Sequence, residues 1–110
     1  MEPTKLPADF AFVPEMYADA YFPEAQVAKV GKAIRQVADL LETGERSPES
    51  VQKELDEMTR KINALQDDFA DHDSELETGA REAIAETVER LLEYFGVAID
   101  LEQALRERDW

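Results

Sequence analysis

Residues 23–48 read PEAQVAKVGKAIRQVADLLETGERSP, and this stretch decides the fold. Its apolar side chains recur at alternating three- and four-residue intervals, the spacing of one face of an α-helix. They are Val27, Val30, Ile34, Val37 and Leu41. Pro23 suits a first helical turn, and Gly44 suits a C-terminal cap. Because Ser47-Pro48 suits the start of another helix, the stretch predicts a helix, a short connection and a second helix.

The pattern continues along the chain and predicts an all-α protein. The second helix repeats the spacing with Val51, Leu55, Met58, Ile62, Leu65 and Phe69, so we expect an antiparallel hairpin. A third helix is expected from about Glu75 to Phe95, ended by Gly96. A last short helix starts at Asp100, whose side chain can cap it. The predicted fold is a small helical bundle of three main helices with short N-terminal and C-terminal helices.

The N-terminal segment is expected to differ from the rest. Pro3 and Pro7 oppose regular structure, so residues 1–13 are predicted to form an extended arm before a single helical domain at 14–110. Five of the nine aromatic residues fall between positions 10 and 22. We expect the arm to lie across the bundle and to cover one open end of its core. Gly31, on the core stripe, predicts a close approach of another backbone.

Composition excludes several classes of function. The chain has 12 basic and 26 acidic residues and a net charge of −14, which repels nucleic acids and anionic lipids and favours basic partners. Without cysteine and with one histidine, it can build neither thiolate sites nor zinc sites of several imidazoles. No apolar run approaches the about 18 residues of a membrane span. The sequence therefore favours a cytoplasmic protein without a cofactor, a nucleic-acid ligand or a membrane anchor.

The most unusual stretch is DDFADHDSELETGARE, residues 67–82. Ser74 and Glu77 fit a capping box at the start of the third helix, in which each side chain binds a free backbone amide. Glu77 and Arg81 are four residues apart and are predicted to form a partly buried ion pair. The same pair also suits a second interpretation, in which Arg81 is held to bind an anion. We favour the structural role, because charges that are buried need such partners.

Metal binding and catalysis by the 71–82 region are alternatives. The acids fit an EF-hand loop that begins at Asp71, except that Leu76 replaces the glycine that the loop needs for its turn. Residues 71–74 resemble a compressed Asp-His-Ser triad, but adjacent residues cannot align nucleophile and base. Acid–base chemistry by His72 with an aspartate stays open. Glu54–Glu57 and Glu86–Glu89 have the ExxE spacing of a metal-dependent hydrolase, but Glu86 and Glu89 are expected to point away from the apolar face and to lie on a solvated surface.

Four acids of this stretch have no structural explanation: Asp67, Asp68, Asp71 and Asp73. They lie near the negative end of the second helix, where acidic groups are unfavourable. We expect the hairpin to place Lys29, Lys32 and Arg35 nearer the start of the second helix than its finish, which leaves internal compensation incomplete. These aspartates are therefore the predicted binding surface for a basic protein partner.

The segments MYADAYFP, SELETGARE, EYFG and the final RDW resemble a family of small bacterial proteins catalogued only as a domain of unknown function. The family's YFP start, SEIET-x-ARE centre and C-terminal RDW correspond here to 17–23, 74–82 and 108–110, while residues 42–66 match poorly. The resemblance implies a cytoplasmic α-helical protein and no catalytic residue. We expect a non-enzymatic interaction protein, such as an inhibitor or immunity-type protein. The alternative is a metal- or anion-binding enzyme that uses residues 71–82, and the oligomeric state, a homodimer included, is left open.

Overall fold

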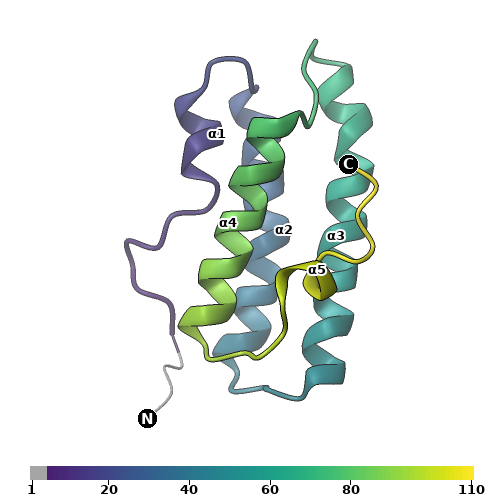
Figure 1. Cartoon of the computed structure of the whole chain (residues 1–110). Coiled ribbons are helices and arrows are strands. Elements are labelled where there is room, and N and C mark those ends of the chain that lie inside the picture. Colours follow the sequence, from purple (N-terminus) through teal and green to yellow (C-terminus); the bar gives the residue numbers. More distant parts are fainter. Residues whose placement is uncertain (1–4) are drawn as a thin grey trace.

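The computed structural model describes residues 5–110 and confirms the all-α class, with no strand in that range. Three long helices and two short ones follow one another along the chain (Figure 1). They are α1 (Pro14–Ala18), α2 (Glu24–Glu42), α3 (Pro48–Ala70), α4 (Thr78–Tyr94) and α5 (Leu101–Ala104). None of these helices is both long enough and apolar enough to cross a lipid bilayer.

The predicted hairpin of α2 and α3 is the centre of the fold, and α4 runs beside it (Figure 1). All five residues of the predicted α2 stripe are fully buried. In α3 the predicted stripe is buried as well, except that Leu65 is partly exposed. The apolar face of α4 completes the core with Ile84, Val88 and Leu91. The helical periodicity of the sequence therefore located the core correctly.

The helix boundaries follow the predicted signals in most places. Gly44 and Gly96 have positive φ angles of 95° and 69° just after α2 and α4, a backbone conformation that glycine adopts without steric cost. The Asp100 carboxylate accepts a hydrogen bond of 2.9 Å from the Gln103 amide and caps α5, as predicted. One boundary is wrong, because α4 begins at Thr78 rather than near Glu75.

The N-terminal arm lies along the side of the bundle, so the expectation that it covers an open end is wrong (Figure 1). Residues 1–4 of the predicted arm are outside the described residues. The Leu6 amide binds the Glu42 carboxylate at the end of α2, and the Val13 amide binds Thr87 Oγ1 in the middle of α4. The Phe12 side chain, not a backbone, approaches Gly31. The arm thus covers the flank of α2 and α4 with its apolar residues.

The C-terminal segment fills the space between α3 and α4 (Figure 1). Helix α5 contacts both long helices, and Ala104, Leu105 and Trp110 are buried. The last segment therefore contributes apolar side chains to the same core as the long helices.

Candidate functional site at the acidic end of the bundle

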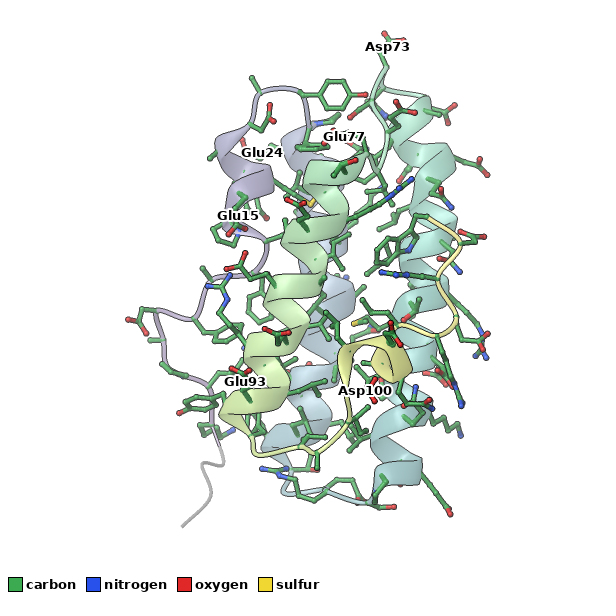
Figure 2. The ribbon with its side chains drawn as sticks, viewed as in Figure 1. Glu15, Glu24, Asp73, Glu77, Glu93 and Asp100 are labelled. Atoms are coloured by element: carbon green, nitrogen blue, oxygen red, sulfur yellow. The ribbon has the colours of Figure 1, made fainter. Side chains whose placement is uncertain are left out.

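Two segments meet at one end of the bundle, and we call them together the acidic end. They are residues 19–24, which connect α1 to the first residue of α2, and residues 67–77, which run from the last turn of α3 to the start of α4. The buried rings of Phe22 and Phe69 hold them together with a centroid separation of 6.4 Å. Tyr21 packs edge-on against Phe22 at 5.1 Å, yet 45 % of it is exposed. Figure 2 shows Glu24, Asp73 and Glu77 at this end.

Helix α3 ends in a motif that normally contains glycine. The Ser74 amide donates to the Phe69 carbonyl at 2.9 Å, and the Asp73 amide donates to the Ala70 carbonyl at 3.1 Å. Asp73 has a φ of 57°, which lies in the left-handed region. Glycine adopts this region readily, and asparagine and aspartate adopt it less readily. The carboxylate of Asp73 also lies at the negative end of the α3 dipole. Both the backbone conformation and the charge of Asp73 therefore reduce the stability of the fold.

The four predicted partner-binding aspartates lie together at the acidic end, but one of them already has a partner. Asp67, Asp71 and Asp73 are exposed, whereas Asp68 is paired with Lys29 at 2.5 Å. The expectation that the lysines of α2 lie nearer the start of α3 was wrong. In an antiparallel hairpin the beginning of α2 lies beside the end of α3, so Lys29 reaches the last turn of α3.

The remaining carboxylates of the acidic end have no cationic partner. Within residues 5–110, no ion pair involves seven of its acids. These are Asp19, Glu24, Asp67, Asp71, Asp73, Glu75 and Glu77. Elsewhere in the described chain Glu42, Asp56 and Glu107 are each paired with an arginine, while other acids, such as Glu49 and Glu82, are not, so the acidic end differs in how closely its unpaired acids lie along two short connections. The acidic end is thus a region of uncompensated negative charge.

The predicted capping box is wrong. Ser74 is buried and its Oγ has no hydrogen-bond partner, while Glu77 is itself the N-cap and accepts a bond of 3.0 Å from the Gly79 amide. Leu76 is buried in the core and Glu77 has an extended backbone, so the chain before Thr78 is not helical. In the described chain no ion pair joins Glu77 to Arg81, and Arg81 is exposed. The predicted ion pair of Glu77 with Arg81 is therefore wrong.

The metal and acid–base interpretations gain no support from the geometry. Across residues 5–110, no three His, Asp or Glu side chains converge closely enough to hold a metal ion. The His72 Nδ1 atom lies 2.9 Å from the Asp68 carbonyl, so the ring is attached to the end of α3 rather than to a neighbouring carboxylate. Glu86 and Glu89 are exposed, as expected, and Glu86 lies 3.8 Å from Arg90.

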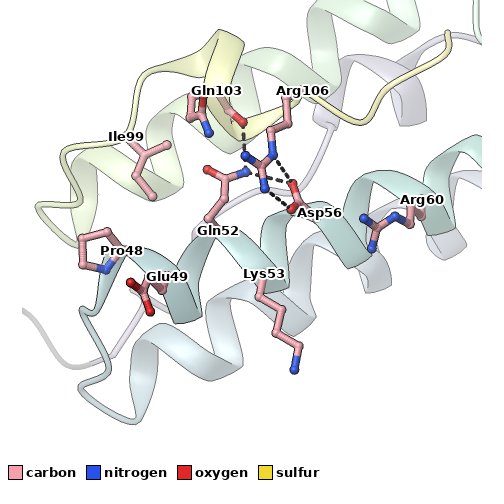
Figure 3. Close-up of a pocket in the computed structure, with 9 residues that line it drawn as sticks. All are labelled: Pro48, Glu49, Gln52, Lys53, Asp56, Arg60, Ile99, Gln103 and Arg106. Carbon is pink, nitrogen blue, oxygen red and sulfur yellow. Dashed lines mark hydrogen bonds and ion pairs between the residues drawn. The ribbon is translucent and has the colours of Figure 1, made fainter.

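A partly buried polar network between α3 and the C-terminal segment was not predicted. Asp56 is only 6 % exposed and accepts hydrogen bonds from Arg106 Nε and Nη2 at 3.1 and 2.7 Å. Gln52 binds both Asp56 and the Gln103 carbonyl at 2.9 Å (Figure 3). The hydrogen bonds from Arg106 lower the pKa of Asp56 more than burial raises it. This carboxylate is therefore held ionised, with its oxygens hydrogen-bonded to Arg106 and Gln52.

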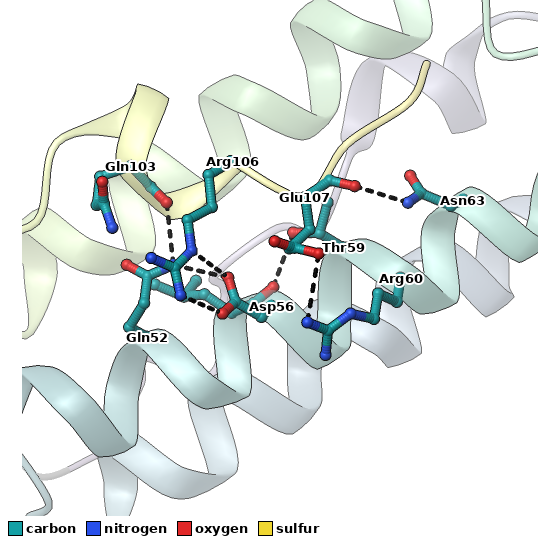
Figure 4. A network of polar contacts seen from close by, with 9 residues as sticks. Gln52, Asp56, Thr59, Arg60, Asn63, Gln103, Arg106 and Glu107 are labelled. Atoms are coloured by element: carbon teal, nitrogen blue, oxygen red, sulfur yellow. Dashed lines mark hydrogen bonds and ion pairs between the residues drawn. The ribbon is translucent and has the colours of Figure 1, made fainter.

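The network continues along α3 to the end of the chain (Figure 4). Arg60 pairs with Glu107 at 3.3 Å, and the Asn63 side chain binds the Glu107 carbonyl at 2.8 Å. A sequence signal for this docking site was present beside the apolar stripe of α3. It is a second stripe of polar residues at four- and three-residue intervals: Gln52, Asp56, Thr59, Asn63 and Gln66. The shallow cavity beside it, about 510 Å³, is lined by both acidic and basic side chains and has no single charge preference (Figure 3).

Comparison with known proteins identifies the family but gives no activity. No curated protein and no solved structure matches the chain. The model of a family of unknown function, DUF5713, matches residues 7–110. This range includes residues 42–66, the part of the chain that least resembles the family's sequence pattern. The chain therefore belongs to the DUF5713 family of unknown function.

Proposed function

We propose that this protein is a non-enzymatic interaction protein whose acidic end binds a basic protein, in the manner of an inhibitor or immunity-type protein. The observation that carries the proposal is the set of seven carboxylates without an ion-pair partner at the acidic end. A cytoplasmic location in a bacterium is part of the proposal. Aspartates crowded at the end of a helix cost stability, and a basic partner would offset that cost on binding.

The conformation of Asp73 supports the proposal independently of the charge count. A glycine there would relieve the positive φ of 57° and would remove a charge from the negative end of α3. Strain of this kind is concentrated at functional sites in proteins. Asp73 is therefore better explained by binding than by folding.

Exposed tyrosines provide the second element of a binding surface. In the described chain the large apolar side chains that are exposed are Tyr17, Tyr21 and Tyr94. Tyr21 belongs to the acidic end, and Tyr17 lies four residues earlier in α1. Tyrosine is enriched at the centres of protein interfaces, and its ring face attracts arginine and lysine. Tyrosines beside uncompensated carboxylates suit a partner rich in these two residues.

The alternative, an enzyme that binds a metal or an anion through residues 71–82, has weaker support. Among the described residues, the acids of this region do not converge on one point as the ligands of a metal ion would. An interaction surface needs no convergence of this kind.

Affinity capture with three baits tests the proposal. The baits are the wild type, a quadruple variant with asparagine at positions 67, 68, 71 and 73, and a control with glutamine for the exposed acids Glu82, Glu86, Glu89 and Glu93 of α4. Both variants lose four negative charges, but only the first loses them at the acidic end. We expect the wild type and the α4 control to capture a basic protein from the source organism's lysate. The quadruple variant should not capture it. Equal capture by all three baits would contradict the proposal.

A further inference from the structure

The outer face of the α2–α3 hairpin carries a groove of about 350 Å³ that is distinct from the acidic end in its charge. Its floor is apolar and consists of Ala33 from α2 with Ala64 and Leu65 from α3. Leu65 belongs to the apolar stripe of α3 but is only partly buried. The small alanines on both helices leave a shallow trough between them, into which a larger apolar side chain can fit.

Lysines surround this floor, and no carboxylate lines the groove. Lys29 is paired with Asp68, and the Lys61 ammonium donates a hydrogen bond to Gln36. Lys32 is exposed and has no hydrogen bond or ion pair within residues 5–110. In a chain with 26 acidic and 12 basic residues, a groove lined by three lysines and no acid is a marked local reversal of charge.

We propose that this groove docks an acidic amphipathic helix of another protein. An apolar anchor of that helix would cover Ala33, Ala64 and Leu65, and flanking glutamates or aspartates would pair with Lys32 and Lys61. The rest of the protein does not prevent this pairing, because physiological salt screens distant charges over about 8 Å. A second copy of this chain is the other occupant to be distinguished, and the experiment below does so.

The test uses two synthetic peptides and the full-length protein labelled with ¹⁵N. Both peptides are amphipathic helices of about 16 residues with the same leucine stripe, one with glutamate and the other with lysine on the flanks. We expect only the glutamate peptide to cause saturable shifts of the Ala33, Ala64 and Leu65 amides. The double variant Lys32→Glu/Lys61→Glu should bind this peptide at least about tenfold more weakly.

A charge-matched control separates the groove from the overall charge. The variant Lys53→Glu/Arg81→Glu changes two exposed cations outside the groove by the same amount, and it should bind the glutamate peptide like the wild type. Equal weakening by both double variants would overturn the proposal, as would shifts distributed away from the groove or an absence of saturable shifts. Sedimentation of the free protein tests the other occupant. A dimer that Lys32→Glu/Lys61→Glu dissociates would assign the groove to a second copy and would also overturn the proposal.

Discussion

Asp73 and Gly96 occupy the same position in two equivalent helix C-terminal motifs. After each residue, the next amide donates to a carbonyl five positions earlier: Ser74 to Phe69 at 2.9 Å, and Val97 to Leu92 at 2.9 Å. Both residues have positive φ, 57° for Asp73 and 69° for Gly96. The same local structure is therefore built once with the residue that favours it and once with an acidic residue that does not.

Replacing Asp73 by glycine should stabilise the protein. We expect the free energy of unfolding to rise by about 1 kcal/mol, because the change relieves the left-handed strain and removes a charge from the negative end of α3. Gly96→Asp should lower it by a similar amount. Urea denaturation of both variants measures these changes. A destabilised Asp73→Gly protein would show that the carboxylate has a structural role.

Ser74→Ala distinguishes the observed start of α4 from the predicted capping box. A capping serine would cost about 1 kcal/mol on removal, whereas the buried Ser74 hydroxyl has no partner and its removal should be neutral or stabilising. Glu77→Ala removes the observed cap and should cost about 1 kcal/mol. Thermal and chemical denaturation of the Ser74→Ala and Glu77→Ala variants show which substitution lowers the free energy of unfolding more. A larger loss of stability for Ser74→Ala than for Glu77→Ala would support the predicted capping box instead.

Gly31→Ala should stabilise α2. A Cβ at this position would lie 3.5 Å from Phe12 Cβ, which is an ordinary van der Waals contact, and alanine is favoured over glycine in a helix by about 1 kcal/mol. Gly44→Ala is the control: it has open space around it but a φ of 95°, so it should destabilise. If Gly31→Ala also destabilised the protein, the arm would pack against α2 more tightly than the structure shows.

The Asp56–Arg106 pair should make part of the stability dependent on pH. Arg106 lowers the pKa of Asp56 in the folded state below its value in the unfolded chain. The pair therefore contributes fully to the free energy of unfolding at a pH above the pKa of Asp56 in the unfolded chain. This contribution is lost as the pH falls through the pKa of Asp56 in the folded protein. Asp56→Asn should therefore lower the free energy of unfolding at pH 7 by about 1–3 kcal/mol, and by clearly less at pH 3.

The control for this pH effect is Asp39→Asn, which changes an exposed carboxylate paired with Arg35. It should alter the free energy of unfolding by no more than about 0.5 kcal/mol at either pH. An Asp56→Asn effect of the same size at pH 7 and pH 3 would contradict the account of the buried pair.

The long helices could be predicted because their apolar stripes are regular, with proline at the start of α2 and α3 and glycine after the end of α2 and α4. The start of α4 could not, because Ser74 and Glu77 have the spacing of a capping box, while the burial of Leu76 is a tertiary effect. The position of the arm depended on packing against α2 and α4, which no local signal encodes.

The candidate site was predicted in part. The four aspartates do lie together at the surface, but the pairing of Lys29 with Asp68 was missed through an error about which ends of an antiparallel hairpin meet. The polar stripe from Gln52 to Gln66 could have been predicted from the sequence, because its residues recur at helical spacing. The segment that binds this polar stripe could not be predicted, because its residues lie roughly 40 to 50 positions further along the chain.

The most direct test of the acidic end as a binding surface is the association rate with the captured basic protein. The quadruple asparagine variant at 67, 68, 71 and 73 should associate at least about tenfold more slowly than the wild type near 0.1 M salt, and the difference should shrink as salt rises. The α4 glutamine control should stay close to the wild-type rate. Equal rates for the quadruple variant and the wild type, with both proteins folded, would contradict the account.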